Sequence, residues 1–258
     1  KDRPNVTWLQ NTTAAGYYDH NMVLAVEHEP ETAWLRERLW RVRAKKVMIA
    51  TGAVERPLIF PGNDRPGVML ADAVARYVSR FAAVPGKRAV VYTNNSTAYA
   101  HLELLLKAGI AIKQVVDSRA TPGEAELEVA RRNSVSVMTN ARITHVEGRS
   151  VVKGVTVVSA SGTKRVSCDL VCHSGGWNPL IHLYSHAGGK SVFNRDTAAF
   201  VPGELAQEAH CVGAANGTFS VAGGLNEADE IARVLVQDLT GQKVQSSSLG
   251  AEVAEIPY

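Results

Sequence analysis

The sequence is poor in cysteine and in net charge, and it has no long hydrophobic run. Three cysteines among 258 residues do not make the disulfide framework of a secreted domain, so we expect reduced, buried thiols in a cytoplasmic protein. Cys168 and Cys172 would lie about 13 Å apart in one predicted strand, too far for a disulfide. The 28 basic and 25 acidic residues leave a net charge of +3, which excludes nucleic-acid binding by bulk charge alone. No apolar run approaches the roughly 20 residues of a membrane span.

The first residues also lack a start methionine and any pattern of a signal or transit peptide. We therefore expect an internal piece of a longer protein. The apolar share of 45% and the charged share of 21% are typical of a soluble globular protein with one or two domains.

The N-terminal part of the chain has the pattern of an antiparallel meander. Strands are predicted at Val6–Leu9, Met22–Glu27 and Leu35–Arg43, followed by an apolar strand at Lys46–Gly52. The Pro/Gly-rich residues 56–67 are interpreted as a linker between domains.

The middle of the chain alternates between strands and helices. Helical spacing predicts helices at 71–81, 98–108 and 124–132, and apolar runs predict strands at 87–92, 111–116 and 135–138. This βαβαβ order is typical of a parallel, doubly wound sheet. Strands are then predicted at 143–147, 151–158, 165–171 and 209–212, with a last helix at 231–239.

The first strand-turn-helix of this alternation is the place for a Gly-x-Gly-x-x-Gly dinucleotide fingerprint. Here the turn reads Thr93-Asn94-Asn95-Ser96-Thr97-Ala98, so the first two glycines are replaced and only the small third residue is kept. A side chain at Asn95 blocks the approach of a pyrophosphate to the backbone. Asp117 ends the next strand, where an acid would bind a ribose; as the alternative, it caps the following turn. We expect a dinucleotide fold that does not bind a dinucleotide in the usual way.

Two other arrangements indicate little chemistry. The Cys-x-x-Cys pair of a disulfide reductase is missing from the sequence. His182 and His186 are spaced as two metal ligands on one helix face, but no third ligand group lies nearby, so we favour a surface or interface helix and expect no metal site.

Four stretches carry a resemblance to a known family. They are 50–57 (Ala-Thr-Gly-Ala-Val-Glu-Arg-Pro), 63–70 (Asn-Asp-Arg-Pro-Gly-Val-Met-Leu), 174–179 (Ser-Gly-Gly-Trp-Asn-Pro) and 200–203 (Phe-Val-Pro-Gly). Together they resemble the alpha subunits of heterotetrameric sarcosine oxidases. The broader similarity is to two-dinucleotide-domain flavoproteins such as glutathione and thioredoxin reductases.

The resemblance implies an oxidoreductase subunit that takes part in the oxidative demethylation of sarcosine. It implies a non-catalytic NAD in the first dinucleotide-binding domain, and FAD and FMN held by or with partner subunits. It also implies a tetrahydrofolate domain outside this chain and partner subunits of the beta, gamma and delta type. Catalysis by this chain alone is not expected.

With this resemblance, the fold class is α/β: a Rossmann-like FAD/NAD(P)-binding domain inserted in a second, incomplete dinucleotide-binding domain with a β-meander. Residues 1–68 and 177–245 are assigned to the incomplete first domain, 69–176 to the degenerate second domain, and 246–258 to a linker or tail.

NAD is expected to contact two segments that follow strands of the first domain. One is Ala50, Thr51 and Gly52, and the other is Gly213, Thr218, Phe219 and Ser220. Backbone N–H groups near a helix start bind anions, and hydroxyl groups add hydrogen bonds. An ordinary strand-to-helix turn at 213–220 stays an alternative. Two other functions also stay open: a scaffold without bound cofactor, or a subunit of an opine or amino-acid dehydrogenase of the same plan.

Overall fold

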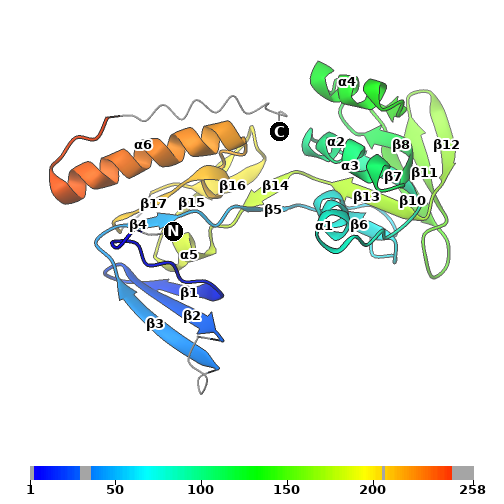
Figure 1. Cartoon of the computed structure of the whole chain (residues 1–258). Helices are drawn as coiled ribbons and strands as arrows, with labels where there is room; N and C mark the ends of the chain where they lie inside the picture. The colour runs from blue at the N-terminus through cyan, green and yellow to red at the C-terminus, as the bar shows by residue number, and fades with distance from the viewer. Residues whose placement is uncertain (1–2, 30–35, 205–206, 246–258) are drawn as a thin grey trace. The chain divides into compact units, whose positions relative to one another are not determined.

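The computed structural model describes residues 3–29, 36–204 and 207–245 (Figure 1). The chain forms two compact units. Unit 1 is built from the described parts of Lys1–Ala53 and Pro179–Val253, and unit 2 from Val54–Asn178. The chain crosses between the units at β5 (Ala53–Glu55) and β14 (Trp177–Pro179), and these two strands pair with each other.

Unit 2 contains a five-stranded sheet in the order β6-β13-β7-β8-β9, and every neighbouring pair is parallel. Its strands are β6 (Val68–Leu70), β7 (Arg88–Thr93), β8 (Ala111–Asp117), β9 (Val137–Met138) and β13 (Leu170–Ser174). Its helices are α1 (Ala71–Phe81), α2 (Thr97–Ala100), α3 (Leu102–Lys107) and α4 (Glu124–Arg132). The predicted parallel α/β sheet is therefore confirmed.

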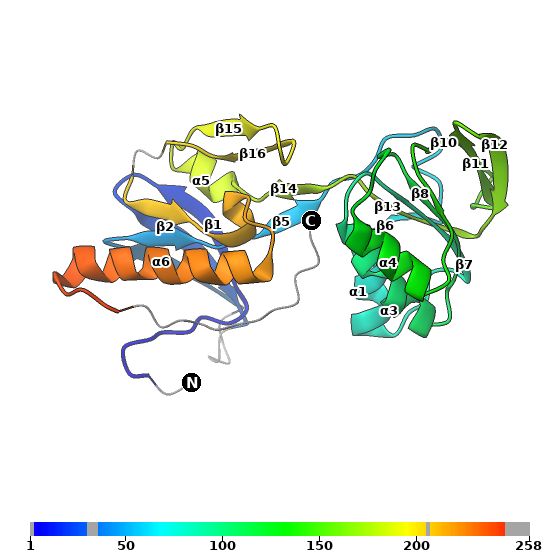
Figure 2. The ribbon, with the colours of Figure 1, turned by 90° about the horizontal axis from the view of Figure 1, so that it is seen from above.

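Side-chain alternation along β7 gives this sheet two buried faces. Ala89 and Val91 pack in one core cluster with residues of the helices. Val90 and Tyr92 pack in a second cluster with an antiparallel sheet, β10-β11-β12. The parallel sheet thus lies between a helical layer and a β layer (Figure 2). The β layer consists of β10 (Arg142–Glu147), β11 (Gly154–Ser159) and β12 (Gly162–Ser167).

Unit 1 is mostly made of small sheets. Its antiparallel meander, β1-β2-β3, comprises β1 (Thr12–Tyr18), β2 (Met22–His28) and β3 (Glu37–Arg43). A parallel pair joins β4 (Val47–Ile49) to β17 (Ala209–Cys211), and a hairpin joins β15 (Ser191–Asn194) to β16 (Ala199–Pro202). The remaining elements are α5 (His182–His186), a 3-10 turn η1 (Gly213–Asn216) and α6 (Val221–Thr240).

The long helix α6 buries none of its 20 residues. Apolar side chains such as Leu225, Val234 and Leu239 are 41–45% exposed. A helix of this length gains most of its stability by packing an apolar face. The described residues of unit 1 leave these apolar side chains partly exposed.

Several predicted elements are absent or have other bounds. Residues Val6–Leu9 do not form a strand, and the side chain of Trp8 is 78% exposed. The predicted helix 98–108 is divided at His101, whose N–H bonds to Ala98 O three residues back. The last helix begins ten residues before the predicted start, at Val221, because Ser220 caps it by accepting a hydrogen bond from Gly223 N. The predicted tail at 246–258 lies outside the described residues.

The predicted strand 165–171 belongs to two different sheets. Its first part is β12 of the antiparallel layer, and its last part is β13 of the parallel sheet. Asp169 stands at the change, where its carboxylate accepts hydrogen bonds of 2.8 Å from Lys87 N and Arg88 N. These bonds hold the chain at the start of β7 while it passes from one layer to the other.

The three cysteines are free and buried, as predicted. His182 and His186 lie in α5, and His186 Nδ1 accepts a hydrogen bond from Tyr17 N. Within the described ranges, there is no group of three or more His, Cys, Asp or Glu side chains suited to a metal ion. The same ranges also contain no helix that is long and apolar enough to cross a membrane.

Candidate functional site

The two predicted cofactor-binding segments begin side by side in unit 1. The strands β4 and β17 pair in parallel, with Ile49 opposite Cys211, and Val212 N donates to Ile49 O at 3.0 Å. Both strands therefore end at the same edge. Ala50 directly follows β4, and Gly213 follows β17 after one residue, Val212.

Glycine is required at two places on this edge. Gly52 has φ +77° and Gly213 has φ +64°, and a Cβ built on either residue would have no neighbour within 4 Å. The positive φ, rather than crowding, is therefore what favours glycine at both positions. Thr51 is tied back to the chain, because its hydroxyl donates to Leu180 O at 2.6 Å and Leu180 N donates to Gly52 O at 2.9 Å.

Glu227, a residue of α6 that the sequence analysis did not single out, holds the turn after β17. Its carboxylate accepts hydrogen bonds from Gly213 N at 2.6 Å and from the Asn216 side chain. Burial and the charge of Glu227 raise the pKa of the neighbouring Cys211 thiol to about 11. The sequence signal for this contact is weak, because Glu227 lies 14 residues after Gly213 inside a segment rich in small residues.

The other predicted residues lead from this turn into α6. Thr218 N donates to Gly213 O at 3.1 Å, Phe219 follows, and Ser220 is the N-cap of α6. A Cβ on Gly224 would lie 3.5 Å from Gly213 Cα. The first turn of α6 therefore packs closely against the end of the β17 segment.

In unit 2, the turn that replaces the dinucleotide fingerprint is filled by its own hydrogen bonds. The Asn95 amide nitrogen donates to the carbonyl and hydroxyl oxygens of Ser174, both at 3.1 Å. Asn95 Oδ1 accepts from Thr97 N at 3.1 Å and from the Thr97 hydroxyl. Thr93 Oγ1 donates to Asn95 O at 2.9 Å. The Asn95 side chain thus bridges the ends of β7 and β13.

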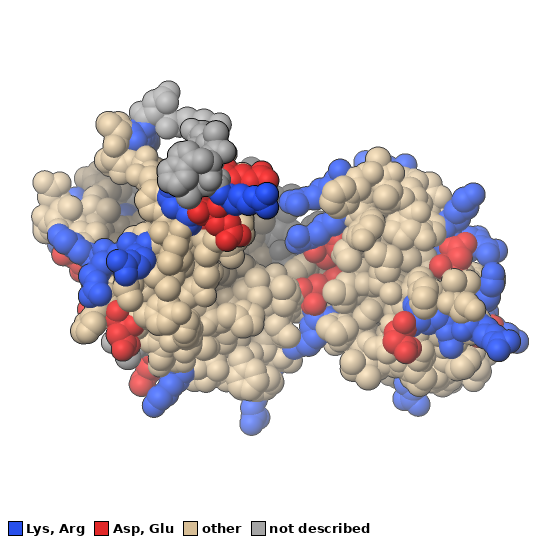
Figure 3. Space-filling model, turned by 90° about the horizontal axis from the view of Figure 1, so that it is seen from below, with Lys and Arg blue, Asp and Glu red and all other residues tan. Residues whose placement is uncertain are grey.

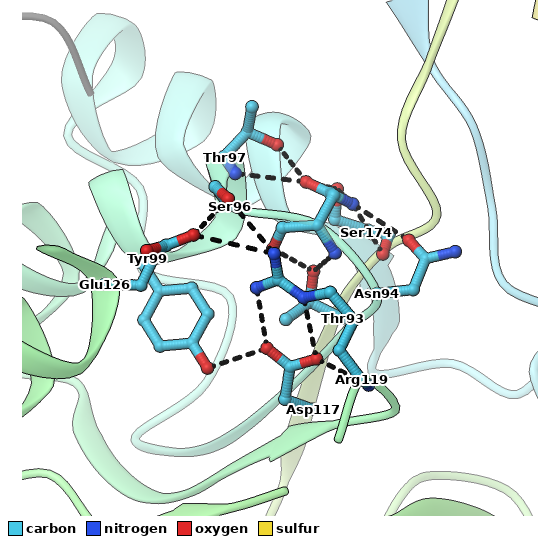
Figure 4. Close-up of polar contacts among 10 residues, drawn as sticks. Thr93, Asn94, Ser96, Thr97, Tyr99, Asp117, Arg119, Glu126 and Ser174 are labelled. Carbon is cyan, nitrogen blue, oxygen red and sulfur yellow. Dashed lines mark hydrogen bonds and ion pairs between the residues drawn. The ribbon is translucent and has the colours of Figure 1, made fainter. Parts of the chain in front are cut away.

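Asp117, the acid at the end of β8, is covered by Arg119. The guanidinium donates to both carboxylate oxygens, at 3.1 Å from Nε and 2.8 Å from the terminal nitrogen. Arg119 also donates to Ser96 Oγ at 3.1 Å and lies 3.5 Å from Glu126 Oε1. Tyr99 adds a hydrogen bond of 2.9 Å to Asp117. Figure 4 shows the guanidinium between the two acids.

This cluster holds more negative than positive charge. Asp117 is 0% exposed and Glu126 4%, whereas Arg119 is 27% exposed. Burial opposes the charge of Arg119, but its hydrogen bond to Asp117 and the charges of Asp117 and Glu126 raise its pKa overall. Burial likewise opposes the charge of Glu126, and hydrogen bonds, including that from Ser96, together with Arg119 lower its pKa overall. The arginine is therefore the counterion of two buried acids.

On the face of the protein that Figure 3 shows, charged side chains of one sign are not concentrated in one place. Acidic and basic side chains both occur on each unit there. This agrees with the small net charge of the whole chain.

No family model matches the chain. Among curated proteins, the sarcosine oxidase alpha subunit of Rhizobium meliloti (strain 1021) is 37% identical over 246 residues, covering 93% of this chain and 24% of that protein. Its counterpart in Corynebacterium sp. (strain P-1) is 36% identical over 235 residues, covering 85% of this chain and 24% of that protein. An opine oxidase subunit of Rhizobium meliloti (strain 1021) is 27% identical over 170 residues, with 65% and 34% covered.

Solved structures share the fold at low sequence identity. L-proline dehydrogenase from P. horikoshii has a TM-score of 0.65 at 21% identity, covering 91% of this chain and 42% of that chain. Thioredoxin reductase from T. acidophilum has a TM-score of 0.64 at 16% identity, with 79% and 69% covered. An FAD-dependent pyridine nucleotide-disulphide oxidoreductase from Desulfovibrio vulgaris is also similar, with a TM-score of 0.57 at 17% identity, covering 92% of this chain and 62% of that chain.

These comparisons confirm the resemblance and the α/β fold class. The chain spans about a quarter of the length of the sarcosine oxidase subunits that it matches. It is a homologue of that segment of the sarcosine oxidase alpha subunit, with the Rossmann-like fold of the pyridine nucleotide-disulfide oxidoreductases.

Proposed function

We propose that the chain is part of an oxidoreductase subunit of the sarcosine oxidase alpha type, in which it holds a non-catalytic NAD. The observation that carries the proposal is the 37% identity over 246 residues to a sarcosine oxidase alpha subunit. In this proposal, sarcosine is oxidised at flavins, FAD and FMN, held by or with beta, gamma and delta type subunits. The methyl group passes to tetrahydrofolate in a domain outside this chain.

The NAD site is proposed at the shared edge of β4 and β17. In open α/β sheets, ligands bind beyond the carboxyl ends of parallel strands. Ala50, Thr51 and Gly52 lie beyond one such strand, and Gly213 lies beyond the other. Thr218, Phe219 and Ser220 lead into α6, whose first N–H groups favour an anion. When bound, NAD would be held by backbone and hydroxyl groups of these residues.

Unit 1 is proposed to be one part of a larger dinucleotide-binding domain, and unit 2 to be the degenerate second domain. The exposed apolar side chains of α6 support the first assignment, because a parallel strand pair and a long helix normally belong to a more fully covered sheet. The filled turn at Asn95 supports the second.

Gly213→Leu in the full-length subunit should weaken NAD binding by about tenfold or more, equivalent to about 1.4 kcal/mol. A leucine at φ +64° is strained and projects from the proposed binding edge. Calorimetric titration with NAD measures the effect. The matched control is Gly109→Leu, since Gly109 in unit 2 also has a positive φ, +83°, and open space around its Cβ. Equal NAD affinity in both variants would show that the site is placed wrongly.

The second candidate function is an opine oxidase-type subunit, which the 27% identity to a subunit of opine oxidase favours. The two candidates differ in substrate. Oxygen consumption by the full complex should saturate with sarcosine and stay at background with an opine, since the identity to the sarcosine oxidases is higher and extends over more of the chain. The reverse result would favour the second candidate.

A further inference from the structure

The strand order of unit 2 reverses between β7 and β13, and doubly wound sheets form their ligand crevice beyond the carboxyl ends of the strands at such a point. From β7 the chain proceeds to β8 and β9 on one side, and it later returns to β13 on the other side. In this protein, the ends that meet there are Thr93 of β7 and Ser174 of β13.

Two side chains occupy the positions that a dinucleotide would need. Asn95 spans the crevice, bonded to Ser174 on one side and to Thr97 on the other. Arg119 covers both oxygens of Asp117, the residue placed to bind a ribose diol. Asn95 and Arg119 come from different loops, so the two obstructions are separate.

We propose that unit 2 retains a dinucleotide crevice which its own side chains keep closed, Asn95 by bridging β7 and β13 and Arg119 by covering Asp117. Both must be removed for NAD to bind. Thr93→Gly and Asn95→Gly free the backbone of the turn, but Arg119 still covers both oxygens of Asp117. Removal of the Arg119 side chain alone uncovers Asp117, which keeps its hydrogen bonds from Tyr99 and from the backbone N–H of residue 119, while the bridge at Asn95 remains. This inference concerns unit 2 and is independent of the NAD site proposed in unit 1.

Trp177 provides a readout coupled to this crevice through Thr97. Its indole N–H donates to Thr97 Oγ1 at 3.1 Å, and Thr97 in turn bonds to Asn95. In the full chain labelled with 15N-tryptophan, the indole signal of Trp177 is assigned by its loss in Trp177→Phe. A ligand that enters the crevice shifts this signal as the ligand concentration rises, and NAD is the probe.

The wild type and the double variant Thr93→Gly/Asn95→Gly should show no saturable shift at millimolar NAD. Adding Arg119→Ala should produce one, with affinity at least about tenfold above the limit set by the double variant. In the control, Arg131→Ala is added to the double variant in place of Arg119→Ala. NAD binding should then stay as it is in the double variant. Asp117→Asn in the triple variant should abolish the gain.

Saturation at submillimolar NAD in the wild type that persists in Gly213→Leu, which disturbs the site proposed in unit 1, would overturn the proposal, since the crevice would then be open. So would a triple variant that melts cooperatively but binds no better than the double variant. If the alanine variant does not melt cooperatively, Arg119→Lys takes its place and is judged by the same criterion. A lysine keeps a positive charge beside the two acids but cannot cover both oxygens of Asp117 as a guanidinium does.

Discussion

Arg119→Met should destabilise the protein by about 3–5 kcal/mol, the usual cost of removing one partner of a buried ion pair. Methionine keeps much of the side-chain volume but leaves Asp117 and Glu126 without their counterion. These acids are 0% and 4% exposed, so water cannot replace the guanidinium. Urea denaturation at neutral pH, monitored by circular dichroism, measures the change in the free energy of unfolding.

Arg131→Met is the matched control for this loss of charge. Arg131 also pairs with two acids, Glu124 and Glu128, but all three side chains are at least 58% exposed. Exposed pairs contribute about 0–1 kcal/mol. Adding Glu126→Gln to Arg119→Met should recover part of the lost stability, because one uncompensated charge is removed. A loss for Arg119→Met no larger than that of the control would contradict the role assigned to the cluster.

The second large effect is expected from Glu55, a buried residue of β5 whose carboxylate accepts a hydrogen bond from Asp72 N at 2.9 Å. Burial raises the pKa of Glu55 from an ordinary 4.5 to about 7, and hydrogen bonds from Ser174 and Asp72 N offset only part of this rise. The folded protein therefore keeps the proton over a pH range in which the unfolded chain has already lost it.

Taken alone, this shift lowers the free energy of unfolding as pH rises from 4.5 to 7, by roughly 3.5 kcal/mol in all, at about 1.4 kcal/mol for each unit of pKa. Outside this window the contribution of Glu55 is constant, because both states hold the proton below it and both have lost it above it. Burial lowers the pKa of His173 to about 4, which raises stability over part of the same range, so the contribution of Glu55 is read as the difference between wild type and variant. Glu55→Gln should remove this contribution. The measurement is the difference in unfolding free energy between pH 4.5 and pH 8, in wild type and variant.

Glu147→Gln serves as the control for this titration. The hydrogen bond from Arg165 lowers the pKa of Glu147, so its linkage has the opposite sign and its loss cannot flatten the decline between pH 4.5 and 7. If wild type and Glu55→Gln lost the same stability over this interval, Glu55 would not be the group that titrates.

Periodic segments of the sequence were sufficient to predict much of the unit 2 sheet. The spacing of apolar residues predicted 71–81 and 124–132 as helices, and α1 and α4 have these bounds. The strands β7 and β8 were each predicted to within one residue at either end. These elements follow from local pattern because each presents a regular apolar face to one buried layer.

Other features depend on contacts between distant residues, which local pattern does not contain. Apolar character alone made 165–171 one strand, whereas bonds from Asp169 to the start of β7 divide it between two sheets. The first ten residues of α6 were missed because Gly223 and Gly224 disfavour a helix, yet the Ser220 cap and the approach of Gly224 to Gly213 start the helix at Val221.

For the candidate sites, the sequence was sufficient to predict which residues end the strands, because Ala50, Gly213 and Asp117 each follow a β-rich run. It also showed that the fingerprint glycines are missing at Thr93 and Asn95. That β4 and β17 end together, and that Arg119, shared with Glu126, covers Asp117, became visible only in the folded chain. Strand ends follow from local apolar patterns, whereas packing between segments far apart in the chain sets the neighbours of a buried charge.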